Sequence, residues 1–238
     1  MLKSFLFWKL SFVVLFLWCS SYSQDLTPNK YGLSVVDKPE TYQNLVEKDS
    51  NNLLVDIEKY IPGIKLDIKY ANKDNFMQKV LYPEAKAYAR LPVAKALVKI
   101  QNELKKKGLE LKIFDIYRPY SITLLMWDEI KDDRYVADPK KGSRHNRGCA
   151  VDLTIIESAT GNELEMPTPF DDFTNKAHHS YKNLTKKVLN NRSLLRNIME
   201  KHGFQIITSE WWHYDLKGYS KYHLMDISFN QLNKLNKP

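Results

Sequence analysis

The stretch SRHNRGCAVD at residues 143–152 contains a histidine and, at the start of an apolar segment, an aspartate. It is matched further along the chain by EWWHYD at 210–215, which contains another histidine. Together, His145, Asp152 and His213 offer two imidazoles and one carboxylate. Three such protein ligands leave the fourth position of a tetrahedral zinc ion open. These two stretches therefore predict an open metal site of the kind that supports catalysis.

Glu210 stands three residues before His213 and is the candidate general base. An open zinc site makes hydroxide available near neutral pH, and a neighbouring carboxylate can take up a proton and pass it to a leaving amine. In an ideal strand, residues three apart face opposite ways, so both can serve one metal only if the chain turns or bulges around Trp211. The pattern is typical of peptide-bond hydrolysis.

The surroundings of His145 favour a metal ligand over an ordinary loop histidine, although a lone histidine is more often the latter. Gly148 permits a close turn after it. Asp152 lies in a predicted strand, on the same face as Ala150 and Thr154. A carboxylate in such an apolar strand needs a cation or hydrogen bonds, which a metal site would supply.

Further motifs surround these two stretches in a fixed order: LDIKYANKDNF at 66–76, Asp115-x-Tyr117-Arg118-Pro119, Met166-x-x-x-Phe170-Asp171 followed by His178-His179, and Arg196-x-Ile198-Met199-Glu200. With the histidine stretches, they resemble the D-alanyl-D-alanine dipeptidases, the VanX-like branch of the zinc D,D-peptidases. The resemblance covers roughly residues 55–216. It implies an α+β fold: a single compact, hedgehog-like domain in which helices flank a central antiparallel sheet.

The resemblance also implies a role for each site residue. One zinc ion per chain would be held by the two histidines and the aspartate named first, with Glu210 as the base and Arg118 steadying the charge of the tetrahedral intermediate. Asp171 and Tyr70 would hold the free ammonium of the substrate, and Ser143 its carboxylate end. The implied substrate is the dipeptide D-Ala-D-Ala, hydrolysed to free D-alanine.

Other interpretations of these residues stay open. Arg118 could form a structural ion pair with Asp115 or Asp128. Asp171 and Asp172 could cap a helix over 173–180. The adjacent pair His178-His179 is expected to support the site or to form ordinary hydrogen bonds, because neighbouring residues rarely aim at one ion.

Two other functions also remain possible. A zinc D,D- or L,D-carboxypeptidase or endopeptidase acting on peptidoglycan stems would need a cleft that is open on the amino side, where Asp171 would otherwise bind an ammonium. A non-catalytic, zinc-stabilised binding domain would need neither Glu210 nor Arg118. The presence of both residues favours the enzyme.

Residues 1–23 have the pattern of a secretory signal peptide: a positive start, an apolar run and small residues before Gln24. The run, Leu10 to Trp18, is far shorter than the ~20 residues of a membrane-spanning helix. The bulk of Trp18 disfavours lipoprotein anchoring at Cys19. We therefore expect cleavage near Gln24, secretion to the periplasm and no stable membrane insertion. The leader is a departure, because well-known members of the resembled family work in the cytoplasm.

Removal of the leader takes away two lysines and Cys19, which lowers the formal net charge from +8 to +6 and leaves Cys149 alone. A single cysteine forms no internal disulfide, so we expect a small buried side chain there. The remaining lysines are scattered and no basic-aromatic motif is present, so a nucleic-acid partner is not expected. The sequence gives no indication of the oligomeric state.

The chain is expected to divide into the leader, a polar, mobile arm over 24–52 and a catalytic domain over 53–238. Hydrophobic periodicity and helix-stop signals predict the main elements of that domain. They are helices over 91–107, 119–131 and 193–202, and strands over 109–115, 150–156 and 204–208.

Overall fold

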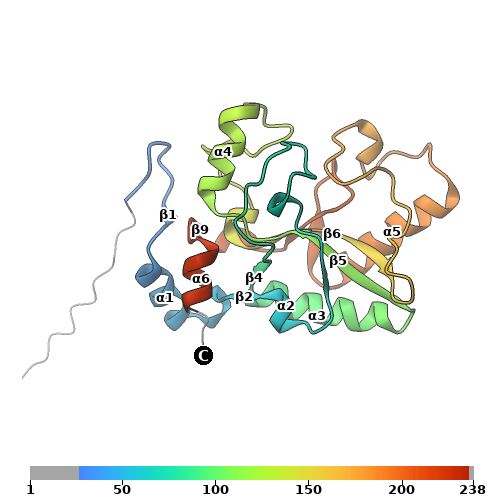
Figure 1. Cartoon of the computed structure of the whole chain (residues 1–238), viewed down its shortest axis with the longest axis horizontal. Coiled ribbons are helices and arrows are strands. Elements are labelled where there is room, and N and C mark those ends of the chain that lie inside the picture. Colours follow the sequence, from blue (N-terminus) through green and yellow to red (C-terminus); the bar gives the residue numbers. More distant parts are fainter. Residues whose placement is uncertain (1–26, 236–238) are drawn as a thin grey trace, which may run out of the picture.

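The computed structural model describes residues 27–235 of the chain, and the predicted leader lies outside them. The described residues form an α+β domain (Figure 1). Its helices are α1 (Pro39–Lys48), α2 (Ile57–Tyr60), α3 (Leu91–Lys105), α4 (Tyr120–Ile130), α5 (Lys186–Lys201) and α6 (Phe229–Leu235). Its strands are β1 (Val35–Val36), β2 (Leu54–Asp56), β3 (Lys65–Leu66), β4 (Tyr88–Arg90), β5 (Leu109–Asp115), β6 (Ala150–Glu157), β7 (Phe204–Ile206), β8 (His213–Leu216) and β9 (Leu224–Met225).

A five-stranded sheet in the order β3-β5-β6-β8-β7 forms the centre of the domain. Every neighbouring pair is antiparallel except β3 and β5, which run parallel at one edge. The predicted α+β class is confirmed, and the sheet is antiparallel over four of its five strands. Two smaller sheets, β2-β4 and β1-β9, complete the pairing.

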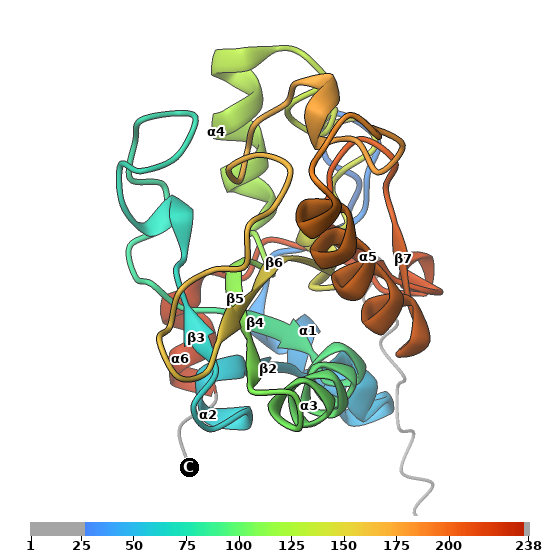
Figure 2. The ribbon, with the colours of Figure 1, turned by 90° about the vertical axis from the view of Figure 1, so that its right-hand side faces the viewer.

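Helices and loops lie on both sides of this sheet. Helix α3 runs below it and α5 lies at its right-hand end, whereas α4 and several long loops stand above it (Figures 1 and 2). Strand β6, in the middle, is buried along its whole length up to Glu157. Its β-branched composition suits such a position.

Helix α3 forms as predicted. Its buried residues, among them Val93, Leu97, Ile100 and Leu104, recur at helical spacing. Pro92 lies in the first turn, where its missing N–H costs no helical hydrogen bond. The predicted strand over 109–115 and helix over 119–131 are also confirmed as β5 and α4.

Helix α5 begins at Lys186, seven residues before the predicted start at 193. The side chain of Thr185 caps it, because its Oγ1 accepts a hydrogen bond from the Val188 N–H at 3.3 Å. The first two turns carry mainly polar side chains, which hid them from an argument based on hydrophobic spacing. The helix ends at Lys201, just before Gly203, which has a positive φ of 92° and provides the expected stop.

The polar segment that precedes the domain is more ordered than predicted. From Val35 onward it contains β1 and α1, and both Val36 and Tyr42 are buried. The Tyr42 hydroxyl accepts a hydrogen bond from the Leu54 N–H at 2.8 Å. A few apolar side chains are thus enough to hold a segment whose polar composition suggested mobility. Among the described residues, no helix is long and apolar enough to cross a membrane.

Candidate metal and substrate site

Pairing in the central sheet brings three site residues into one row. Asp152 on β6 lies opposite His213 on β8 and opposite Asp115 on β5. The register of β5 shifts between Ile113 and Asp115, and this irregularity places Asp115 opposite Asp152. Residues far apart in the sequence thus become neighbours across adjacent strands.

His145 reaches this row from a short 3-10 helix, His145–Arg147, that directly precedes β6. The turn closes at Gly148, whose N–H donates to the His145 carbonyl at 2.9 Å. Gly148 has a positive φ of 66°, and a Cβ at this position would lie 2.6 Å from the Leu54 side chain. Glycine is required there on both counts.

Residues 143–149, directly before β6, form the metal loop, and two of its polar side chains hold it in place by hydrogen bonds. The Ser143 Oγ accepts a hydrogen bond from the His145 N–H at 3.2 Å, and the Asn146 Oδ1 accepts one from the Ser143 N–H at 2.7 Å. The Asn146 amide also donates to the Arg118 carbonyl and to the Thr123 hydroxyl. The loop is therefore tied to the start of α4, and Ser143 is placed beside a metal-ligand candidate.

The outer side of the loop rests on Arg90, which is fully buried. Its N–H donates to the Gly148 carbonyl at 3.0 Å and its Nε to the Arg147 carbonyl at 2.8 Å. The guanidinium also donates to the carbonyls of Asn52 and His223. Arg90 thereby joins the loop to segments near both ends of the domain.

Cys149, the free cysteine among the described residues, is buried in this loop as expected. Burial raises the pKa of its thiol to about 12. The positive charge of Arg90 lowers this pKa, but by less than burial raises it. The thiol is therefore uncharged at neutral pH, and the group of side chains that could hold a metal, His145, Asp152 and His213, does not include it.

The possible ligand atoms of the three metal-site residues converge. His145 Nε2 lies 3.3 Å from His213 Nδ1 and 3.3 Å from an oxygen of Asp152. His213 Nδ1 lies 2.9 Å from the other Asp152 oxygen. One ligand atom from each residue lies within 4.8 Å of the other two, and all three residues are buried. Two nitrogens and one oxygen in this arrangement fit a divalent ion such as zinc.

Hydrogen bonds on the opposite ring nitrogens orient both imidazoles. His145 Nδ1 lies 2.6 Å from the Ile116 carbonyl, and His213 Nε2 lies 2.9 Å from Asp215 Oδ1. Because these oxygens accept hydrogen bonds, each contact places a proton on the nitrogen that faces away from the metal position. The other nitrogen of each ring, Nε2 of His145 and Nδ1 of His213, is therefore the one that faces the metal position.

The charges of the site depend on one another. Burial alone would raise the pKa of Asp152, but His145 and His213 hold it well below its usual range. Burial alone would lower the pKa of His213, but Asp152 and Asp215 hold it well above its usual range. In the metal-free protein the His213 ring therefore carries a second proton, on the Nδ1 that faces Asp152. A metal ion must displace this proton to bind there.

Glu210 lies just before β8, where the chain turns as the sequence required. A turn at 208–209 and bends at Trp211 and Trp212 carry it to the metal side. Its Oε2 lies 3.9 Å from His213 Nδ1. Burial raises the pKa of the Glu210 carboxyl, and the charge of His213 partly opposes this effect. Both tryptophans belong to the core, as expected.

The pair His178-His179 supports this turn and does not reach the metal residues. The His179 N–H donates to the Thr208 carbonyl at 3.0 Å, and the His178 carbonyl accepts a hydrogen bond from Arg192 at 2.9 Å. Burial, together with the charges of nearby arginines, lowers the pKa of His179 to about 4. Its ring is therefore neutral at neutral pH.

Arg118 forms the ion pair with Asp115 that its sequence position left open as a structural interpretation. It makes an ion pair with Asp115, whose Oδ2 lies 3.1 Å from its Nε and 2.8 Å from its Nη2. Asp115 Oδ2 also lies 3.6 Å from His145 Nδ1. The Arg118 guanidinium is 4.8 Å from the centre of the Tyr70 ring. The ion pair thus holds Arg118 beside both a metal-site histidine and a substrate-site candidate.

Tyr70 and Asp171 meet although they are 101 residues apart in the sequence. The Tyr70 hydroxyl donates to Asp171 Oδ2 at 3.0 Å. Burial and the negative charge of Asp152 raise the pKa of Asp171 well above its ordinary value. Asp172 accepts a hydrogen bond from the Thr174 N–H, and only a short 3-10 helix, Asn175–Ala177, forms where a helix over 173–180 was considered.

Sequence reasoning considered Asp115 as an ion-pair partner of Arg118, and the structure contains this pair. It missed three other contacts: the Ile116 carbonyl on His145, Asp215 on His213, and the approach of Asp115 to the His145 ring. Asp215 left a signal, because residues two apart in a strand share a face and it follows His213 at that spacing. The Ile116 carbonyl left none, since any residue carries such an oxygen.

Replacing Arg118 with lysine is expected to lower kcat/KM about a hundredfold. Lysine keeps the charge but lacks the planar group that here bonds Asp115 through two nitrogens and covers the Tyr70 ring. Steady-state kinetics measures the effect, and circular dichroism checks the fold. An unchanged rate in a folded variant would make Arg118 purely structural.

Comparison with known proteins identifies the family of the chain. Residues 50–231 match a family described as "D-ala-D-ala dipeptidase". The chain is 35% identical over 177 residues to the D-alanyl-D-alanine dipeptidase of Escherichia coli (strain K12), covering 74% of this chain and 91% of that protein. It is 32% identical over 180 residues to the D-alanyl-D-alanine dipeptidase of Enterococcus faecalis (strain ATCC 700802 / V583), covering 67% and 89%.

Among solved structures, the LdcB LD-carboxypeptidase is similar over 82% of this chain and 86% of its own, with 21% identity and a TM-score of 0.38. The family match and the two relatives define the chain as a peptidase. It belongs to the D-alanyl-D-alanine dipeptidase family.

Proposed function

We propose that this peptidase hydrolyses the dipeptide D-Ala-D-Ala to D-alanine, with one zinc ion per chain held by His145, Asp152 and His213. The supporting observation is the convergence of these ligand atoms, with Glu210 at one side and the part-buried, hydrogen-bonded pair of Tyr70 and Asp171 nearby. The names of the relatives support the choice of substrate and its stereochemistry.

The residues around the metal position divide the work of the reaction. Bound zinc would acidify a water molecule and polarise the scissile carbonyl. Glu210 Oε2 takes the proton of the attacking water and passes it to the leaving amine. The burial of Glu210 suits this proton transfer, because it raises the pKa of the carboxyl toward the pH at which the enzyme works. The Arg118 guanidinium stabilises the negative charge that develops on the carbonyl oxygen.

The two ends of the dipeptide bind to different elements. The Asp171 carboxylate accepts the substrate ammonium, and the Tyr70 hydroxyl holds one of its oxygens in place. Ser143, beside His145, receives the carboxylate end. An ammonium also neutralises the buried carboxylate, whose own burial and neighbour Asp152 resist its charged form.

Free alanine released from D-Ala-D-Ala, L-Ala-L-Ala and a longer peptide ending in D-Ala-D-Ala tests the proposal directly. We expect the zinc-loaded protein to release alanine from D-Ala-D-Ala at least about tenfold faster than from either of the others, a difference of about 1.4 kcal/mol. Faster release from the longer peptide would point to a carboxypeptidase. Zinc binding with no release from any peptide would point to a binding domain.

Acetylation of the amino group of D-Ala-D-Ala is expected to lower kcat/KM at least ~30-fold. Acetylation removes the positive charge and leaves the part-buried Asp171 carboxylate without a cation, and loss of one partner of such a pair typically costs about 2–5 kcal/mol. Kinetics on the free and acetylated dipeptides measure the ratio. The variant Asp171→Ala serves as the control, because it should lower kcat/KM more for the free dipeptide than for the acetylated one and so reduce the ratio of the two values. Equal cleavage of both by the unmodified enzyme would favour the carboxypeptidase.

We also propose that residues 1–23 direct the protein to the periplasm and are removed near Gln24. The proposal is supported by the charge, length and small-residue pattern of that segment. Amino-terminal sequencing of the protein recovered from periplasmic and cytoplasmic fractions tests it. An intact leader on protein confined to the cytoplasm would contradict it.

A further inference from the structure

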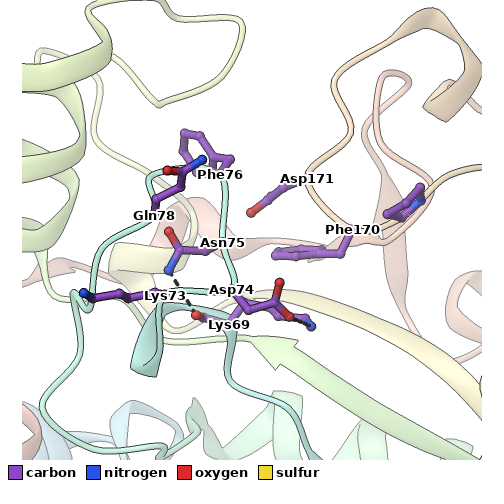
Figure 3. A pocket seen from close by; sticks show the side chains of 9 residues that line it. Lys69, Lys73, Asp74, Asn75, Phe76, Gln78, Phe170 and Asp171 are labelled. Atoms are coloured by element: carbon purple, nitrogen blue, oxygen red, sulfur yellow. Dashed lines mark hydrogen bonds and ion pairs between the residues drawn. The ribbon is translucent and has the colours of Figure 1, made fainter.

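A pocket of about 770 Å³ lies beside Asp171, between the loop of residues 69–78 and the segment 169–171. Its walls include the rings of Phe76 and Phe170 and the amide side chain of Gln78, and the Asp171 carboxylate extends into the gap between the two segments (Figure 3). This volume lies within the roughly 300–1,000 Å³ of small-molecule sites.

The pocket adjoins the catalytic residues without including them. Its lining contains none of the three metal-ligand candidates, Glu210 or Arg118. Asp171 links the pocket to the catalytic residues. Its Oδ2 accepts a hydrogen bond from the Tyr70 hydroxyl, and the Arg118 guanidinium lies over the Tyr70 ring. A substrate whose ammonium binds Asp171 therefore has its first Cα at the boundary between the metal residues and this pocket.

The pocket wall is already formed by hydrogen bonds within its loop. The Asn75 amide donates to the carbonyls of Lys69, Asn72 and Lys79, at 3.2, 2.7 and 2.7 Å. Its Oδ1 accepts a hydrogen bond from the Met77 N–H at 3.0 Å. Gln78 is held with a positive φ of 53°. The loop thus requires no folding step when a ligand enters.

Charges around the pocket are mostly paired. Lys69 lies 3.1 Å from both Asp67 and Asp74. Lys73 extends away from Asp171 (Figure 3). The Gln78 side chain is exposed, and no hydrogen bond of its amide occurs within the described part of the chain. A ligand that meets this wall beside Asp171 finds two phenylalanine rings and the free amide of Gln78, whereas the charged end of Lys73, which also lines the pocket, extends away from Asp171.

Phe76 and Phe170 fit the methylene groups of a side chain, and the Gln78 amide fits an amide at its end. We propose that this pocket receives the side chain of the first residue of a dipeptide substrate, and that the enzyme accepts a long, uncharged polar residue such as D-glutamine there. The inference rests on the proposed function, because the ammonium on Asp171 is what places the side chain. An amino-terminal peptide extension is disfavoured, since an amide would leave Asp171 unpaired.

Kinetics of the full-length, zinc-loaded protein on D-Ala-D-Ala, D-Gln-D-Ala, D-Glu-D-Ala and D-Lys-D-Ala test the inference. We expect kcat/KM for D-Gln-D-Ala within about tenfold of that for D-Ala-D-Ala, and at least about tenfold above those of both charged dipeptides. The variant Gln78→Gly should lower the ratio of D-Gln-D-Ala to D-Ala-D-Ala cleavage about fivefold, as expected for one neutral hydrogen bond.

Lys131→Gly is the matched control, because Lys131 also has a positive φ, of 52°, but does not line the pocket. It should leave the ratio unchanged. The inference is overturned if D-Gln-D-Ala is cleaved a hundredfold less efficiently than D-Ala-D-Ala, if the charged dipeptides match it, or if Gln78→Gly leaves the ratio unchanged. Failure to cleave D-Ala-D-Ala itself would overturn the proposed function instead.

Discussion

Replacing Glu210 with glutamine is expected to lower kcat by about a hundredfold or more while metal content stays the same, the range typical of a general acid–base group. Glutamine keeps the shape of the side chain but cannot take a proton from water. Glu210 is the carboxylate next to the metal-ligand atoms without being one of them, with its Oε2 3.9 Å from His213 Nδ1. Metal binding should therefore survive its loss.

Single-turnover kinetics and elemental analysis of the same preparation separate chemistry from metal loss. The control is Glu165→Gln, which changes an exposed glutamate that lies 3.7 Å from Lys187. It should retain full activity. Near-normal turnover of Glu210→Gln would show that another group accepts the proton, whereas loss of zinc would place Glu210 among the ligands.

Replacing His213 with alanine is expected to lower zinc affinity by more than about a hundredfold and to abolish activity with it. Loss of a group that merely orients a ligand typically costs 10–100-fold in metal affinity, so loss of a ligand should exceed this. The substitution also removes the two ring nitrogens of His213 that lie 2.9 Å from Asp152 and from Asp215, so both carboxylates lose a hydrogen-bond donor.

Competition with a chelator of known affinity measures the zinc constant, and the activity assay is run on the same samples. His202→Ala is the matched control, because this histidine lies at the end of α5 beside Glu103. It should bind zinc normally. Full zinc occupancy in His213→Ala would remove His213 from the ligand set.

The sequence predicted the site better where chemistry restricts the choice of residue. A metal needs imidazole or carboxylate groups, and a close turn needs glycine, so His145, Gly148 and Asp152 could be identified from their types and spacing. The structure places the side chains of His145 and Asp152 together with that of His213. It also has the turn before β8 that Glu210 required if it was to face the same side as His213.

Features that depend on many weak contacts could not be predicted in this way. The shift in the register of β5 that places Asp115 opposite Asp152 leaves no composition signal. The packing of α1 depends on a few apolar side chains such as Tyr42 within a polar segment, and local composition favoured a mobile chain. The start of α5 depends on the Thr185 cap, which short-range hydrophobic spacing does not detect.

The burial of Cys149 makes the metal loop observable from outside. A thiol reagent needs the thiolate, and with a pKa of about 12 this group is protonated and enclosed as long as the loop rests on Arg90. A thiol reagent can therefore modify Cys149 only when the metal loop opens. The rate at which a thiol reagent labels Cys149 then measures how often residues 143–152 open by local unfolding. The labelled residue lies four positions from His145 in the sequence.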